Sequence, residues 1–222
     1  MDSLIVALLP NIIGSALVPV QNIINILLLR NPKQGLLKAV AYVSGMTVVR
    51  LLQGVVFGLI FRTESGGEKS PVALTLKLVL GILLLITAYK QWRSEDDPDA
   101  PPPKWMTMLD GLTPIKAFGM GMGMLLLSGK MWVFTLSAIS IIDAWQLGLS
   151  SAAVAYLIFL LLAQSLLLLA LLFRVVLPKK SMVVLGQASE WLARNNRPIT
   201  IAVALVFGLL FFYQGASGLL LG

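Results

Sequence analysis

Long apolar runs separated by short polar segments form the dominant pattern in this chain. A helix that crosses a hydrocarbon layer of about 30 Å needs about 20 apolar residues, and six runs reach that length. They are rich in leucine and show no alternation of period two, so they predict helices and not strands. The predicted spans are Leu4–Leu29, Ala39–Phe61, Pro71–Tyr89, Thr113–Ile142, Ala152–Leu177 and Ile199–Leu221.

Composition supports an all-α integral membrane protein. Of the 222 residues, 58% are hydrophobic and 12% are charged, whereas soluble domains carry about 25% charged residues. The chain has no cysteine and no histidine, which excludes disulfides, thiol chemistry, cysteine or histidine metal sites and histidine-assisted nucleophiles. The carboxylates are scattered, and no nucleotide-binding motif is present. We therefore expect no enzyme activity, no cofactor and no metal site.

The basic residues predict an orientation. The formal net charge is +7, but the Lys and Arg residues cluster in short loops between the apolar runs, which argues against a nucleic-acid partner. The positive-inside rule places the loops after the first, third and fifth spans in the cytoplasm of a bacterial inner membrane. Both termini of this multi-pass chain would then lie outside, in the periplasm. The basic loop residues are Arg30, Lys33, Lys38, Lys90, Arg93, Lys104, Arg174, Lys179, Lys180, Arg194 and Arg197.

The first and fourth spans resemble each other. Each has a proline, then an apolar run, then a helix breaker followed by lysine. With three spans in each half, the halves would be inverted repeats with broken first and fourth helices, which is a transporter architecture. Chance similarity between apolar segments is the alternative. The residues assigned to helix breaks or gating are Pro19, Pro32, Lys33, Pro114, Lys116 and Gly129.

This organisation divides the chain into a first repeat over 1–92, a cytoplasmic linker over 93–112 and a second repeat over 113–222. The linker is acidic and rich in proline, and its carboxylates fit a solvated segment better than a metal site. The second repeat contains an amphipathic helix at about 179–196. Its apolar face would lie in the inner membrane interface or pack against the bundle. That face consists of Val184, Leu185, Ala188, Trp191 and Leu192.

Two cations lie deep in predicted spans. Arg50 is at the centre of the second span and Lys130 is near the middle of the fourth. A central arginine costs at least about 2.5–3.5 kcal/mol on insertion scales, and no acidic residue lies at matching depth. The missing anion would then be the substrate. Snorkelling, or bonds to helix carbonyls, is the alternative.

Amides near these cations would bind the polar part of the same substrate. This predicted set consists of Gln21, Asn22, Asn25 and Gln53. Asn22 and Asn25 are three residues apart and share a helix face. They would line a cavity or form hydrogen bonds between helices.

Four stretches carry a resemblance to a known family: Lys77–Leu85 with Gln91-Trp92-Arg93, Pro103–Met106, Leu109–Gly119 and Trp191–Arg197. Together they resemble the GAP family, also called the sulfolipid-addressing protein family, of the LysE transporter superfamily. The resemblance covers nearly the whole chain and implies six spans in two three-helix repeats. It also implies a role in delivering glycolipids or peptidoglycolipids to the cell surface. One departure is Ser128-Gly129-Lys130, where the family often has Asn-Pro-Lys.

These observations favour a transporter that moves a lipid or glycolipid with an anionic headgroup across the inner membrane. An exporter of small solutes such as amino acids is the first alternative. A non-transporting membrane partner in cell-surface lipid assembly is the second. The expected partners are membrane lipids, a second copy of the chain packed through glycine faces, and the machinery of surface-lipid assembly.

Overall fold

The structure is a computed structural model that describes residues 2–31, 34–63, 71–93, 109 and 111–221. Pro32, Lys33 and most of the predicted linker therefore lie outside the described residues. The described part of the chain forms ten α-helices and no strand. The helices are α1 Asp2–Ala16, α2 Pro19–Arg30, α3 Gly35–Thr63, α4 Pro71–Arg93, α6 Pro114–Leu127, α7 Gly129–Ala144, α8 Leu149–Ala163, α9 Ser165–Val176, α10 Pro178–Arg194 and α11 Asn196–Leu221.

Candidate membrane spans are of two kinds. Two single helices, over Gly35–Ile60 and Asn196–Leu220, are long and apolar enough to cross a membrane alone. Three pairs of helices pass the same test together, as broken spans or re-entrant loops, and are bent at a short break: α1–α2 by 57°, α6–α7 by 74° and α8–α9 by 62°. The chain is thus a helical membrane protein, and the predicted breaks in the first and fourth spans are present. The bend between α8 and α9 was not predicted from the sequence.

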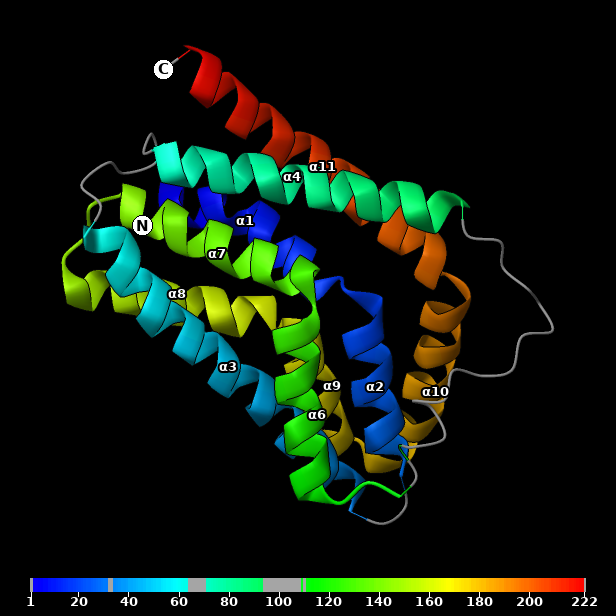
Figure 1. Cartoon of the computed structure of the whole chain (residues 1–222). Coiled ribbons are helices and arrows are strands. Elements are labelled where there is room, and N and C mark those ends of the chain that lie inside the picture. The colour runs from blue at the N-terminus through cyan, green and yellow to red at the C-terminus, as the bar shows by residue number, and fades with distance from the viewer. Residues whose placement is uncertain (1, 32–33, 64–70, 94–108, 110, 222) are drawn as a thin grey trace.

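The helices lie in layers (Figure 1). α4 and α11 run antiparallel along one side, α1 and α7 run beneath them, and α3 and α8 lie beyond that central pair. Glycines permit the close approach of α4 and α11. A Cβ on Gly81 would meet the backbone of Phe212, and a Cβ on Gly215 would meet the backbone of Leu78. The helices α2, α6, α9 and α10 descend from this layered part.

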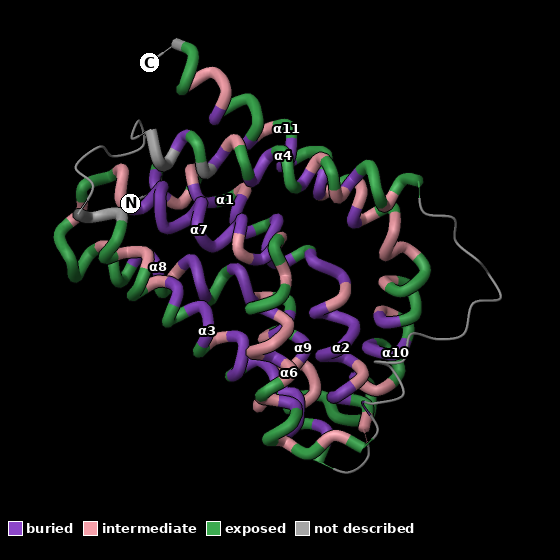
Figure 2. The backbone as a smooth tube through the Cα atoms, in the orientation of Figure 1, coloured by how far each residue is buried: buried purple, intermediate pink, exposed green. Residues whose placement is uncertain are grey.

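Burial is concentrated on α2 and α7 (Figure 2). The outward sides of α3, α4, α8 and α11 expose large apolar side chains, among them Val55, Ile86, Leu161 and Leu209. A soluble protein rarely exposes apolar surface on this scale. These faces are therefore suited to contact with lipid.

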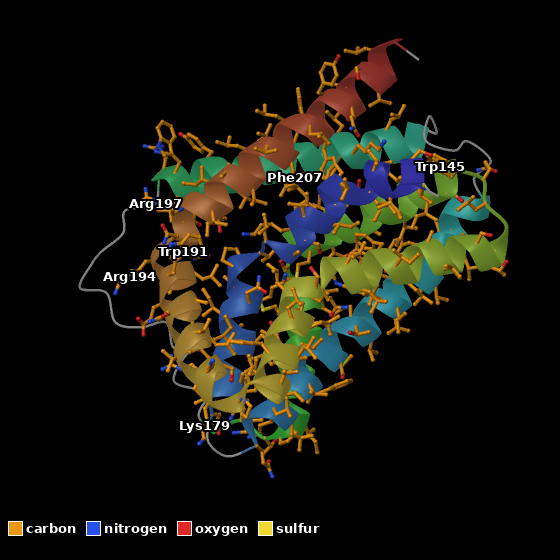
Figure 3. The ribbon with its side chains drawn as sticks, turned by 180° about the vertical axis from the view of Figure 1, so that it is seen from behind. Trp145, Lys179, Trp191, Arg194, Arg197 and Phe207 are labelled. Atoms are coloured by element: carbon orange, nitrogen blue, oxygen red, sulfur yellow. The ribbon has the colours of Figure 1, made fainter. Side chains whose placement is uncertain are left out.

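The predicted amphipathic helix is α10, and its apolar face is divided between two environments. Leu185 is buried in the bundle beside α2, and Ala188 and Leu192 are half-buried against the same core. Val184 and Trp191 are exposed, and Figure 3 shows Trp191, Arg194 and Lys179 directed away from the bundle. Each of the two predicted placements thus applies to part of this helix.

Candidate functional site

The break in the first span is held by buried amides. Pro19 has no backbone N–H, so α1 cannot continue through it without losing a hydrogen bond, and α2 begins there after an extended Val18. The Gln21 side chain donates to the Ser15 carbonyl at 2.6 Å. The Asn22 amide donates to the carbonyls of Ala16 at 2.8 Å and of Val18 at 3.0 Å. Gln21 and Asn22 thus satisfy backbone groups at the break.

Asn25 also uses its amide group within the protein. Its Nδ2 donates to the Leu167 carbonyl of α9 at 3.1 Å. Asn22 and Asn25 were predicted either to line a cavity or to form hydrogen bonds between helices. Both of their NH2 groups donate within the protein, which fits the second role. The oxygens Oε1 of Gln21 and Oδ1 of Asn25 are buried and have no protein partner.

Arg50 is fully buried near the middle of α3. Its Nη2 donates to the hydroxyl of Ser15 on α1 at 2.7 Å. Its Nε and Nη1 have no hydrogen-bond partner among the described residues. The Tyr156 hydroxyl of α8 donates to the Arg50 backbone carbonyl at 2.6 Å. The neutral Ser15 hydroxyl thus holds Nη2 of the guanidinium. Nε and Nη1 remain available to bind a ligand.

Other unpartnered amides lie one helical turn from these contacts. Gln53 follows Arg50 by three residues and Asn11 precedes Ser15 by four, spacings that place each pair on one helix face. Both amides are buried, and neither the nitrogen nor the oxygen of either has a protein partner. We call Asn11, Ser15, Gln21, Arg50 and Gln53 the Arg50 site.

The Arg50 site carries a large desolvation cost. Each buried polar group without a partner costs about 1–3 kcal/mol, and a charged group costs more. A bound anion with hydroxyl groups would offset that cost. Guanidinium nitrogens bind sulfate, phosphate and carboxylate oxygens well, and carboxamides both donate to and accept from hydroxyls.

Lys130 lies at the break in the fourth span. It is the second residue of α7, which begins after the extended Ser128. Its side chain lines a small cavity together with Pro19, Phe134, Leu84 of α4 and Thr200 of α11. The first residue of α2 and the first turn of α7 thus meet at this cavity, and neither helix has a side-chain N-cap there.

The two cations occupy different environments. The contacts of Arg50 come from α1 and α8, whereas the neighbours of Lys130 in its cavity come from α2, α4, α7 and α11. The central pair α1 and α7 lies between the α3–α8 side and the α4–α11 side (Figure 1). Gln21 and Arg50 thus both bond to Ser15, whereas Lys130 lines a cavity beside Pro19.

The remaining predicted break residues have distinct places. Pro114 is the first residue of α6, where Thr113 caps the Lys116 N–H at 3.4 Å, and the Lys116 side chain is exposed. The break itself falls at Ser128 and Gly129. Pro114 therefore starts a helix, as Pro19 does, but it does not interrupt the fourth span.

Sequence reasoning missed two members of the Arg50 site, Asn11 and Ser15, and it also missed Tyr156, which contacts the Arg50 backbone. Asn11 and Ser15 are polar and four residues apart in an apolar run, a signal that could have identified them. Tyr156 has no such signal, because a tyrosine in a leucine-rich helix is ordinary. Among the described residues no group of three or more Asp, Glu, Cys or His side chains could hold a metal ion.

Two stretches that carried the family resemblance contact each other. Arg197, at the start of α11, donates from Nε to the Gln91 carbonyl at 3.0 Å and from Nη2 to the Trp92 carbonyl at 2.8 Å. It thereby caps the end of α4.

No curated protein and no solved structure matches the chain. The family model described as Sap, sulfolipid-1-addressing protein, matches residues 8–217, so the chain belongs to that family.

Proposed function

We propose that this protein moves an amphiphile with an anionic headgroup, a lipid or glycolipid, across the bacterial inner membrane. The single observation that carries the proposal is Arg50, a fully buried guanidinium whose Nε and Nη1 have no partner among the described residues. Family membership supports a lipid-related role. The exposed apolar faces of the spans would leave the acyl chains in contact with lipid.

In this mechanism the headgroup exchanges its water shell for the Arg50 site. Nε and Nη1 of Arg50 bind the anion, and the free oxygen of Gln21 and the amides of Asn11 and Gln53 bind its hydroxyl groups. Lys130, in the cavity beside the α1–α2 break, would receive or release the headgroup on the α4–α11 side. Movement at the α6–α7 break would expose the two environments alternately.

We also propose that the chain consists of two inverted three-helix repeats. In this arrangement α1–α2 corresponds to α6–α7, α3 to α8–α9, and α4 to α11. The two breaks that open the halves support it, since both begin a helix after an extended residue without a side-chain cap. The antiparallel pairing of α4 with α11 would then join the last helices of the two halves.

The test is transport by Arg50→Gln in liposomes that contain a fluorescent anionic lipid. We expect the rate to fall at least about tenfold, because the loss of one charge-assisted contact corresponds to about 1.5–3 kcal/mol. Arg50→Lys, which keeps the charge but loses the planar arrangement of nitrogens, should retain part of the rate. Arg93→Gln is the matched control, since Arg93 is exposed at the end of α4.

Three results would contradict the proposal. If folded Arg50→Gln moves the anionic lipid at the wild-type rate, the anion is not bound at Arg50. If the wild-type protein moves no lipid but exports radiolabelled amino acids, it is a small-solute exporter. Movement of neither would favour a partner that acts only with other machinery. Thermal unfolding of each variant in mild detergent shows whether it is folded.

A further inference from the structure

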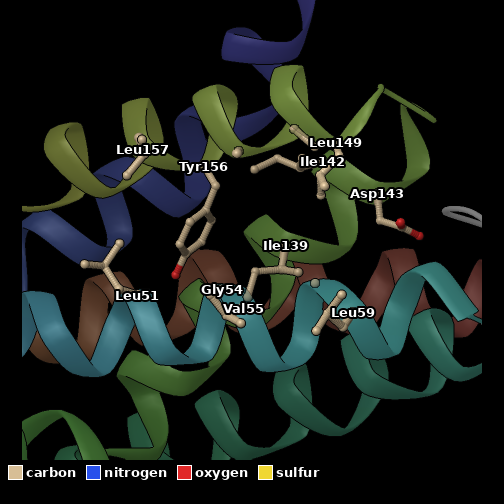
Figure 4. A pocket seen from close by; sticks show the side chains of 13 residues that line it. Leu51, Gly54, Val55, Leu59, Ile139, Ile142, Asp143, Leu149, Tyr156 and Leu157 are labelled. Carbon is tan, nitrogen blue, oxygen red and sulfur yellow. The ribbon is translucent and has the colours of Figure 1, made fainter.

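A cavity of about 310 Å³ lies between α3, α7 and α8 (Figure 4). This volume is at the lower end of the range of ligand pockets, about 300–1,000 Å³. Of its thirteen lining residues only Asp143 and Tyr156 carry polar side-chain atoms. The cavity thus offers an apolar ligand a nearly uniform apolar lining.

The cavity opens on a side of the bundle that is suited to lipid. Val55 of α3 is 62% exposed and Leu149 of α8 is 68% exposed, and both line it. A ligand from a bilayer could therefore enter sideways between α3 and α8 without crossing water. From Leu51 to Leu59, α3 advances about 12 Å along the cavity, so the lining is long enough for an extended chain.

Two glycines of α3 shape the cavity. The Tyr156 ring lies directly over Gly54, where a Cβ would collide with it, whereas a Cβ on Gly58 would meet no atom within 4 Å. Gly54 therefore permits the position of the ring, and Gly58 leaves open space one turn further along the helix. A side chain at position 58 would therefore begin in open space and extend into the cavity that Gly58 lines.

One end of the cavity adjoins the Arg50 site. Tyr156 lines the cavity, and its hydroxyl donates to the Arg50 carbonyl. Gly54, beneath the same ring, directly follows Gln53 in the chain. Tyr156 thus connects the apolar cavity with the backbone at the buried cation.

The opposite end carries the acidic side chain of Asp143, beside Leu59 and Leu149 (Figure 4). The guanidinium at the Arg50 end of the cavity favours an anionic group near it. Charge therefore orients an anionic amphiphile with its headgroup toward Arg50 and the end of its chain toward Asp143.

We propose that this cavity holds one alkyl chain of the amphiphile whose anionic headgroup binds at Arg50. The assignment rests on the proposed function and adds the site of the chain to it. Tyr156 is the partition between the chain and the headgroup. Rotation of its ring away from Gly54 would join the two compartments while one molecule occupies both.

The experiment uses the full chain in lipid nanodiscs. The probe is an anionic phospholipid with a photoactivatable diazirine near the end of one acyl chain, compared with the zwitterionic phosphatidylcholine equivalent. Crosslinked residues are mapped by mass spectrometry. We expect the anionic probe to label 51–59 and 149–157 more strongly than the zwitterionic probe does. Gly58→Leu should lower this labelling about tenfold, because its side chain excludes two or three methylene groups of the ligand.

Gly119→Leu is the matched control, since a Cβ on Gly119 also meets no atom within 4 Å but lies on α6, outside the cavity. Its labelling should equal that of the wild type. Ala153→Leu, which fills the cavity from the exposed side of α8, serves if Gly58→Leu does not fold. It should also lower the labelling.

Two outcomes would overturn the inference. Labelling of the cavity no stronger than that of the outer face of α11 would show that no chain is held there. Equal labelling by the two probes would show that the cavity takes bulk lipid and not the substrate. In either case, transport that still depends on Arg50 would leave the proposed function standing, so the failures of the two proposals are distinguishable.

Discussion

The two broken helices that open the two halves of the chain differ in how their breaks are held. At the α1–α2 break, Gln21 and Asn22 form three buried hydrogen bonds to backbone carbonyls. At the α6–α7 break, a side-chain bond across the gap runs from Trp132 Nε1 to the Leu126 carbonyl at 3.0 Å, and it is exposed. The neighbouring Leu127 is 88% exposed. The bends are 57° and 74°.

This difference separates a fixed break from a loosely held one. Buried hydrogen bonds are expensive to leave unmade, whereas exposed bonds exchange readily with water. The α1–α2 break also positions Ser15, which holds Arg50. We therefore expect the first break to be the rigid support of the Arg50 site and the second to be the place where the bundle moves.

The largest effect is expected at the fixed break. Asn22→Ala removes two buried hydrogen bonds and should lower the free energy of unfolding by about 2–4 kcal/mol, because buried polar groups lose their partner. Reversible unfolding in mixed micelles measures this. Ser150→Ala, an exposed change at the start of α8, is the control. A loss as small as that of the control would show that the amide does not hold the break.

An intermediate effect is expected where α6 contacts α3. A Cβ on Gly121 would collide with the Tyr42 carbonyl, whereas Cβ atoms on Gly119 and Gly123 would meet nothing within 4 Å. Gly121→Ala should therefore cost about 1–3 kcal/mol through overpacking, and Gly119→Ala and Gly123→Ala should cost nothing measurable. Thermal unfolding in detergent compares the three. Equal melting temperatures would mean that α6 is not anchored through Gly121.

The smallest effect on stability is expected at the loose break. Trp132→Phe removes one exposed hydrogen bond and should cost less than about 1 kcal/mol. Hydrogen exchange should nevertheless reveal the difference, because weakly held segments open more often. Amides at 127–131 should exchange faster than those at 17–21 in the wild type, and faster still in the variant. Slower exchange at 127–131 would reverse the assignment of the moving break.

Much of the fold was readable from the sequence because lipid imposes simple rules. Long apolar runs in lipid must be helical, and a proline or glycine within a run predicts where the helix breaks. The breaks in the first and fourth spans followed from those rules, and the amphipathic pattern predicted a helix at about 179–196, which is α10 over Pro178–Arg194. The bend at Gln164 did not, since α8 and α9 join without proline or glycine and their angle depends on packing.

The site was predicted less completely. The burial and the free nitrogens of Arg50 followed from a cation placed in an apolar run. The use of Gln21 and Asn22 to cap carbonyls did not, because sequence shows which groups are polar but not which backbone atoms are free nearby. Lys130 shares the depth of Arg50 along the sequence pattern, but the sequence does not show that its cavity is lined by α2, α4, α7 and α11.

The contact between Arg50 and Ser15 has a consequence for how the protein is made. A span with a central arginine inserts poorly into a bilayer by itself, and the hydroxyl that holds this arginine belongs to the span synthesised just before it. The first two spans would therefore leave the translocon together, as a hairpin with its charge already covered. A serine that looks ordinary in a folded bundle would thus matter most during synthesis, before the rest of the bundle exists.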